Sequence, residues 1–357
     1  MNTLVLIPGR KSLRYAGFVA GSETCTGTIR GFRWQGPRVA LDEVHAIAQA
    51  TGLLDDSTRI MVHSLFGGEE FPNPVSLDDD ALARLQRVAR QSPLHVAHLL
   101  ELAQTLPVSF PGIPVSLAFE TSFFVDLPAR ERLYAVSADL SDKLSLRRWG
   151  YHGLLHEPAC RQAARKLRKQ GLAHAPRILS ICLDPQPEIA GVVGRRPVTV
   201  TSGATPLEGL PGETNCGEID PAVALALAGE AGLGPEGTNA LLTGESGLSG
   251  LVGRRVRLDE VLTNLRSELV QARAVLQYRI LMAAGAAAAA MGGVDGLVFS
   301  GRYATCAAVV ANELLPRLEL AGALPTQTGQ WEIFAKPLEG VLADIATTMA
   351  QSTLSAQ

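Results

Sequence analysis

Residues 278–300 read YRILMAAGAAAAAMGGVDGLVFS, and this stretch decides the fold class. Its first part is rich in alanine, which favours a closely packed helix, and residues 296–300 form a short apolar run typical of a buried strand. Alanine gains little in a bilayer, and Asp295 interrupts the run. A buried helix followed by a strand is therefore favoured over a membrane span.

The same alternation of helix and strand patterns extends outward in both directions. Predicted strands cover 4–7, 57–65, 115–119, 133–138, 177–183, 198–202, 296–300 and 330–334, and predicted helices cover 41–51, 76–91, 220–230, 258–292, 309–320 and 337–349. This pattern predicts layered α/β structure. Because 357 residues exceed what one core usually serves, we expect two domains with a boundary within 142–148.

Composition narrows the class of protein. Apolar residues make up 46% and charged residues 19%, which is typical of a globular chain. A net charge of −3 argues against nucleic-acid binding, since no basic excess is available to displace counterions. Five scattered cysteines without a CxxC pair favour a reducing cytoplasm over a disulfide scaffold or a zinc ribbon.

Generic motifs leave the function open. The sequence has no P-loop, no Rossmann fingerprint after a strand and no nucleophile elbow. His152 and His156 have the i, i+4 spacing of a helical metal pair, but Gly153 stands where a zincin has its glutamate. An ordinary helix start is the favoured interpretation. Without a family, the chain would be an α/β protein of unknown function with two domains.

Several segments, in the same order and at similar spacing, resemble the acetate kinase (acetokinase) family. Residues 66–71 (FGGEEF) resemble HGGE, 119–128 (FETSFFVDLP) resemble FDTAFHQTMP, 148–156 (RWGYHGLLH) resemble RYGFHGTSH, and 205–221 (TPLEGLPGETNCGEIDP) resemble TPLEGLMMGTRSGDIDP; 4–15, 244–250 and 278–300 match in the same way. This collinear set covers the chain to about residue 300.

The resemblance implies an architecture and a reaction. It implies two actin-like (ribonuclease H-like) domains with mixed sheets flanked by helices and a cleft between them. We expect the domains at 1–147 and 148–334, with a C-terminal helix over about 335–357 packing back on the first. Family members are homodimers that transfer the γ-phosphoryl of ATP to acetate or another short carboxylate with Mg²⁺.

Some family site positions keep a functional side chain. His152 matches the histidine that stabilises the transferred phosphate, and Glu120 matches the aspartate of FDT. These two are the candidate catalytic residues, and Glu120 is also the candidate Mg²⁺ ligand. Ser12 and Arg14 in the first turn are candidates for binding phosphate or substrate, as is His63, which replaces an arginine.

The phosphate loops are changed most. The family's HLGNG is CLDPQ here, so Cys182 and Pro185 replace a histidine and an asparagine, and Asp184 brings a negative charge. Asn215 replaces the transition-state arginine, and Arg302 opens the segment that replaces GIGEN. The nucleotide-binding residues are therefore unknown. The metal-side glutamate falls at Gly340, and 255–259 replaces the adenosine segment.

These replacements leave three functions open. The first is a weak or inactive homologue that acts by binding or regulation, with a protein partner. The second is an enzyme with a changed donor, in which Arg10, Arg14, Arg302 and His152 bind pyrophosphate or an acyl phosphate. The third is a working kinase of acetate, propionate or butyrate.

Overall fold

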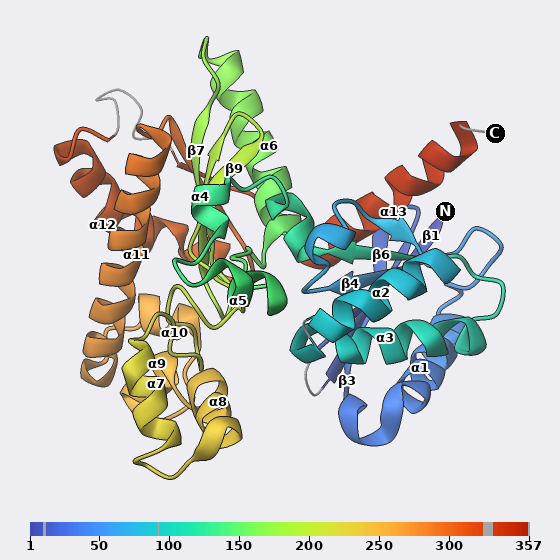
Figure 1. The fold of residues 1–357 in the computed structure, drawn as a ribbon. Coiled ribbons are helices and arrows are strands. Elements are labelled where there is room, and N and C mark those ends of the chain that lie inside the picture. Colours follow the sequence, from blue (N-terminus) through green and yellow to red (C-terminus); the bar gives the residue numbers. More distant parts are fainter. Residues whose placement is uncertain (10–11, 92, 324–330, 356–357) are drawn as a thin grey trace. The chain divides into compact units, whose positions relative to one another are not determined.

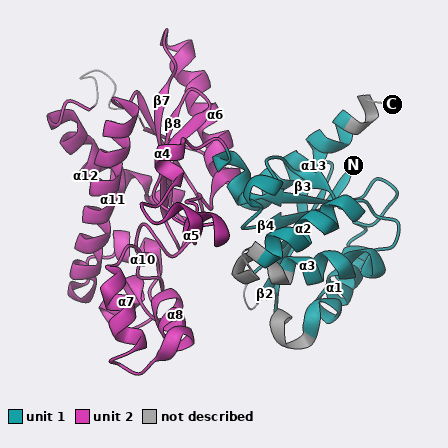
Figure 2. Cartoon of the chain, viewed as in Figure 1, with its two compact units in different colours: residues 1–125, 336–357 teal, residues 126–335 magenta. Residues whose placement is uncertain are grey.

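The computed structural model describes residues 1–357 except 10–11, 92, 324–330 and 356–357, and Figure 1 shows its elements along the chain. The chain divides into two compact units, which Figure 2 colours separately. Unit 1 comprises Met1–Val125 with Lys336–Gln357, and unit 2 comprises Asp126–Ala335. The division falls between Val125 and Asp126, earlier in the chain than the expected boundary at 147–148.

Unit 1 is built on a six-stranded mixed sheet in the order β3-β2-β1-β4-β6-β5. The strands are β1 (Asn2–Pro8), β2 (Ser12–Val19), β3 (Ser22–Arg30), β4 (Arg59–Ser64), β5 (Val75–Ser76) and β6 (Val115–Phe119). β1, β2 and β3 are antiparallel, while β1, β4 and β6 run parallel. The parallel strands carry their site residues at their carboxyl ends, where His63 and Glu120 lie.

Helices cover this sheet. They are α1 (Phe32–Ala50), α2 (Asp79–Gln91), α3 (Pro93–Ser109) and α13 (Leu338–Ser355), and the last of these packs against β1 and β4. The acidic start predicted for the helix after residue 76 acts as expected. The backbone N–H of Ala81 donates to Oδ1 of Asp78 at 2.8 Å, which satisfies an amide that the first helical turn leaves without a partner.

Unit 2 is built on a five-stranded mixed sheet in the order β11-β10-β7-β8-β9. The strands are β7 (Arg177–Cys182), β8 (Glu188–Val193), β9 (Arg196–Val200), β10 (Gly296–Ser300) and β11 (Trp331–Ile333). The helices are α4 (Ala129–Arg132), α5 (Ala138–Lys143), α6 (Gly153–Lys169), α7 (Pro221–Ala228), α8 (Gly234–Gly244), α9 (Gly247–Val252), α10 (Leu258–Thr263), α11 (Val270–Met291) and α12 (Ala307–Leu320).

The decisive stretch folds as predicted, with helix α11 followed by strand β10. One face of α11 is buried in the core of unit 2, through Ala272, Leu276, Ile280, Ala284, Ala287 and Ala288. By length and composition, Ser267–Met291 is apolar enough to cross a membrane, and 33% of its most apolar window is buried. A core helix of a globular protein meets the same criteria.

Some predicted elements differ from the structure. A strand over 133–138 is wrong, because Leu133 makes a single bridge to Arg147 and α5 begins at Ala138. The helical stretch predicted over 258–292, for which the sequence left a division into two parts open, consists of α10 and α11 with a short 3-10 turn between them. The sequence analysis missed β2 and β3, where threonine and glycine replace the clear apolar runs, and β8, which lies between β7 and the edge strand β9.

Candidate functional site

The loop that follows β7 is tied to two neighbouring segments of unit 2. The Leu183 N–H donates to the Ser300 carbonyl at 2.8 Å, and the Leu183 carbonyl accepts from the Tyr303 N–H at 2.8 Å. The Arg302 N–H donates to Oδ1 of Asp184 at 2.7 Å. These bonds bring the loop that replaces HLGNG against the loop that replaces GIGEN, with the Asp184 carboxylate at their junction.

A third segment joins at Pro185, whose carbonyl accepts from the Glu213 N–H at 2.7 Å. Asn215 lies in this segment and is 6% exposed. Its Nδ2 is buried without a hydrogen-bond partner among the described residues. A Cβ added to Gly212 would lie 2.0 Å from Oδ1 of Asn215, so the amide is held tightly within its own loop. Asn215 is therefore a buried, neutral side chain where the family has an arginine.

Glu188 organises the start of α6. Its carboxylate is 1% exposed and accepts from the N–H groups of Tyr151 at 2.8 Å and His152 at 3.0 Å. Its Oε1 lies 3.3 Å from Nε2 of His156, which is fully buried. Burial by itself would raise the pKa of Glu188, but its contact with His156 and the nearby His152 outweigh burial and lower that pKa. A buried carboxylate thus fixes the helix N-terminus that carries His152.

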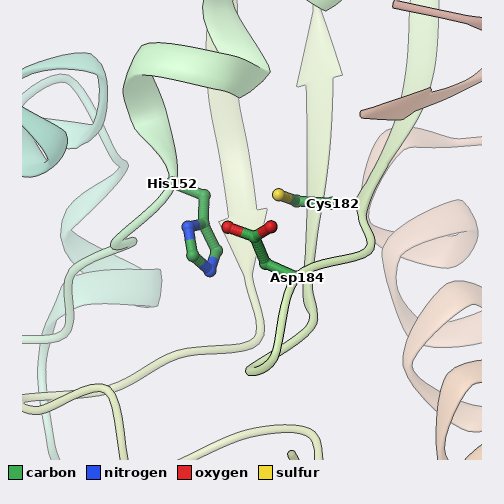
Figure 3. Close-up of side chains that lie close together, drawn as sticks. All are labelled: His152, Cys182 and Asp184. Carbon is green, nitrogen blue, oxygen red and sulfur yellow. The ribbon is translucent and has the colours of Figure 1, made fainter. Parts of the chain in front are cut away.

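His152 is half-buried, and its Nε2 lies 2.9 Å from the Gln186 carbonyl oxygen. Figure 3 shows its ring near the side chains of Cys182 and Asp184. One ligand atom from each of these three residues lies within 4.8 Å of the others. His156 points elsewhere, with Nδ1 2.7 Å from the Ser180 hydroxyl, so this pair of histidines does not form a shared metal site.

Two predicted residues of unit 1 are brought together. Nε2 of His63, at the end of β4, lies 2.8 Å from Oε1 of Glu120, which follows β6. The two residues are 5% and 1% exposed. Nδ1 of His63 is buried and has no hydrogen-bond partner in the described part of the chain. The pair is an internal contact between two parallel strand ends.

Glu120 does not fit the family's Mg²⁺ in this arrangement. Mg²⁺ retains several waters and needs an octahedral oxygen shell with room around it. The Glu120 carboxylate is almost fully buried, and one oxygen is occupied by His63.

The first turn carries Ser12 and Arg14. Ser12 is half-buried, and its carbonyl accepts from the Gly9 N–H at 2.8 Å. Nη1 of Arg14 pairs with Oε1 of Glu339, in the first turn of α13, at 3.1 Å. This carboxylate directly precedes Gly340, where the resemblance implies a metal-side glutamate. Arg10 lies outside the described residues.

Two functional candidates escaped the sequence analysis. Glu188 is the first residue of the apolar strand β8. A charged residue at the start of a buried strand indicates a carboxylate with polar partners, because an unpaired buried charge is costly. Glu339 pairs with Arg14, and spacing along the chain could not reveal this contact. Cys182, Pro185, Asn215 and Arg302 were identified only as replaced family positions, and their contacts required the structure.

Structural comparison defines the class of fold. An acetate kinase from Porphyromonas gingivalis matches with a TM-score of 0.81 at 24% identity, covering 98% of this chain and 99% of that one. A propionate kinase from Francisella tularensis matches with a TM-score of 0.85 at 20% identity, covering 97% and 99%. The predicted fold class of two actin-like α/β domains is confirmed.

Sequence comparison then gives the family. The model of the acetokinase family matches residues 38–335, and this chain belongs to that family. An acetate kinase from Clavibacter michiganensis is 34% identical over 258 residues, covering 72% of this chain and 63% of the relative. One from Coprothermobacter proteolyticus is 32% identical over 260 residues, covering 72% and 64%. These alignments span less than two thirds of the curated relatives.

Proposed function

We propose that this chain binds a short carboxylate or its acyl phosphate and transfers phosphoryl groups from ATP weakly or not at all, acting by binding or regulation. The observation that carries the proposal is the hydrogen bond from the Arg302 N–H to Oδ1 of Asp184 at 2.7 Å. It lies where the family resemblance implies that two loops hold the phosphates of the nucleotide.

Backbone amides that converge on one point hold phosphate in such loops. Here a carboxylate of the protein itself accepts one of these amides, and its negative charge repels phosphate. Pro185 offers no N–H, and Asn215 offers no charge. Losing a transition-state arginine costs about 10³–10⁵ in rate in related phosphoryl transfers. These losses act at one centre, which supports low turnover even though they do not simply add.

The retained residues support a binding role. His152 is half-exposed at the start of α6, and Glu188 accepts from its backbone N–H, so the imidazole retained from the family keeps a fixed place in this loop region. Mg²⁺ and ATP are the family's cofactors, and in this proposal both bind poorly because Glu120 is buried against His63. A regulatory role would then depend on bound carboxylate or acyl phosphate, and a protein partner would bind the ligand-bound form of the chain.

The test is acyl-phosphate formation trapped as hydroxamate, with Mg-ATP and acetate, propionate or butyrate. We expect turnover to be at least about 10³-fold below that of an authentic acetate kinase assayed beside it. The triple variant Asp184→Gly, Pro185→Asn, Asn215→Arg restores family side chains and should raise turnover. Asp142→Asn, an exposed carboxylate of the same unit, should leave it unchanged. Wild-type turnover within about tenfold of the authentic enzyme would contradict the proposal.

Two active alternatives have their own support. A working kinase of acetate, propionate or butyrate is supported by the retained His152. A phosphotransferase that uses pyrophosphate or an acyl phosphate is supported by the exposed Arg302, which makes no ion pair that the described residues record. Hydroxamate formed with pyrophosphate but not with ATP would favour the second alternative over the first.

We further propose a cytoplasmic homodimer. All five cysteines are free, which supports a reducing compartment. The face of α11 opposite its buried side exposes Tyr278 and Met282 at 58% and 54%. Large apolar side chains gathered on one helix face mark a protein contact. Light scattering should give twice the chain mass, and Tyr278→Glu should shift the protein towards monomer.

A further inference from the structure

We propose that His152, Cys182 and Asp184 form a binding site for a borderline-soft divalent cation of the zinc type. The three residues come from the start of α6, the end of β7 and the loop after it (Figure 3). One ligand atom from each lies within 4.8 Å of the other two. Ligand atoms around a tetrahedral zinc are about 3.5 Å apart, so small side-chain rotations would close the site.

The donor set selects the cation. It offers one imidazole nitrogen, one sulfur and one carboxylate oxygen. Sulfur and imidazole donors favour zinc over magnesium and calcium, which prefer oxygen ligands throughout. Three protein ligands leave a fourth tetrahedral position, as in zinc sites that bind water or a substrate oxygen. The site would therefore accept an anionic oxygen, such as one of phosphate or a carboxylate.

The surroundings orient two of the ligands. A carbonyl oxygen cannot donate a hydrogen bond, so Nε2 of His152 must carry the proton that it shares with the Gln186 carbonyl at 2.9 Å. In the neutral imidazole Nδ1 is then the basic nitrogen, and a metal would bind there; histidine ligands are commonly held by a carbonyl in this way. Oδ1 of Asp184 is held by the Arg302 N–H, which leaves Oδ2 for the cation.

The third ligand, Cys182, has an unusual neighbourhood. It is fully buried, and its register partner in β10 is Ser300, also fully buried. Register partners on parallel strands point to the same face of the sheet. The Ser300 hydroxyl has no hydrogen-bond partner among the described residues, and it lies on the side from which it can donate to a thiolate. The absence of a side chain at Gly301 makes room for the sulfur, because a Cβ at this position would lie 3.0 Å from Sγ of Cys182.

Access and charge are consistent with a cation. His152 and Asp184 are half-buried, so the site opens towards solvent on one side while the sulfur stays covered. Binding forms a metal–sulfur bond and releases the thiol proton to solvent, and Asp184 supplies a second negative charge. The cation would restore positive charge at a loop in which the family binds phosphate. This inference stands apart from the proposed function, because it concerns cation binding and not turnover.

The test is a Co²⁺ titration of the chelator-treated full-length chain, followed by visible and near-ultraviolet absorption. We expect one equivalent of Co²⁺ with a thiolate charge-transfer band, and Zn²⁺ should displace it. Cys182→Ser should abolish the band. Cys306→Ser, which removes another buried thiol of unit 2, should keep it. Inorganic phosphate should shift the visible bands if the fourth position is open.

Asp184→Asn separates loss of a ligand from loss of fold, since its amide oxygen can still accept from the Arg302 N–H. It should weaken Co²⁺ binding about 10- to 100-fold with an unchanged circular dichroism spectrum. The inference is overturned if the wild-type protein gives no thiolate band, if the band persists in Cys182→Ser, or if Asp184→Asn binds as tightly as wild type. None of these outcomes bears on the hydroxamate assay.

Discussion

Glu188 is the residue whose removal should disturb the site of unit 2 most. Its buried carboxylate accepts from two backbone N–H groups and contacts His156. In Glu188→Ala all three contacts are lost. A buried donor left without an acceptor costs about 1–3 kcal/mol, and breaking a buried charged contact costs about 3–5 kcal/mol.

The N–H of His152 is partly accessible, so water can replace the carboxylate there, whereas the N–H of Tyr151 and the ring of His156 are buried. We therefore expect Glu188→Ala to lower the free energy of unfolding of unit 2 by about 3–5 kcal/mol. Glu188→Gln keeps one acceptor oxygen and should cost about 1–3 kcal/mol. Glu157→Gln, which removes an exposed ion pair on the same helix, should cost less than about 1 kcal/mol.

Urea unfolding followed by tryptophan emission measures these differences in a Trp34→Phe background, because the other two tryptophans, Trp149 and Trp331, both lie in unit 2. The chain has two units, so transitions from emission and from circular dichroism must be compared before one free energy is assigned. Amide exchange over residues 151–156 gives a local check, since α6 should open there first. A cost below about 1 kcal/mol for Glu188→Ala would refute the role assigned to this carboxylate.

Three further predictions test separate contacts. His63→Ala should destabilise unit 1 by about 1–3 kcal/mol in urea, because it removes the 2.8 Å contact between Nε2 of His63 and Oε1 of the buried Glu120; a cost near zero would mean that the contact is replaceable. Gly301→Ala should cost about 1–3 kcal/mol, since φ is 90° and its Cβ would lie 2.7 Å from a carbonyl oxygen; an unchanged midpoint would contradict this strain. Burial alone would raise the pKa of Asp295, but its hydrogen bonds with Arg177 outweigh burial and hold the pKa below its ordinary 3.8. The stabilisation that Asp295 contributes should be complete above about pH 4 and should fall as the pH drops below that value. Asp295→Asn should remove this dependence on acid.

The effect of acid on stability follows from the lowered pKa of Asp295. A carboxyl group with a lowered pKa in the folded state binds its proton more weakly there than in the unfolded chain. Acid therefore favours unfolding, and stability is lost as pH falls. A midpoint in urea that stays constant between pH 5 and about pH 3 would contradict the contribution of Asp295.

The sequence by itself determined the family and most of the regular elements. Strands at 115–119 and 296–300 have the bounds of β6 and β10, because each is a short, mostly apolar run followed by a polar or glycine segment. The collinear segments determined the fold class, since an ordered set of motifs constrains the whole chain more tightly than any local propensity. Local pattern failed at 133–138, where alternating apolar residues have no neighbouring strand to pair with beyond one bridge.

Only the tertiary structure decided what the site residues contact. Spacing along the chain could not reveal that Asp184 accepts the Arg302 N–H, because 118 positions separate them. The same holds for His63 and Glu120, which meet because parallel strands end at one edge of a sheet. The sequence does not distinguish a carboxylate that is open to a cation from one that is buried against a histidine. Folding sets that difference, since burial and hydrogen bonding are fixed by neighbours that lie far away in the chain.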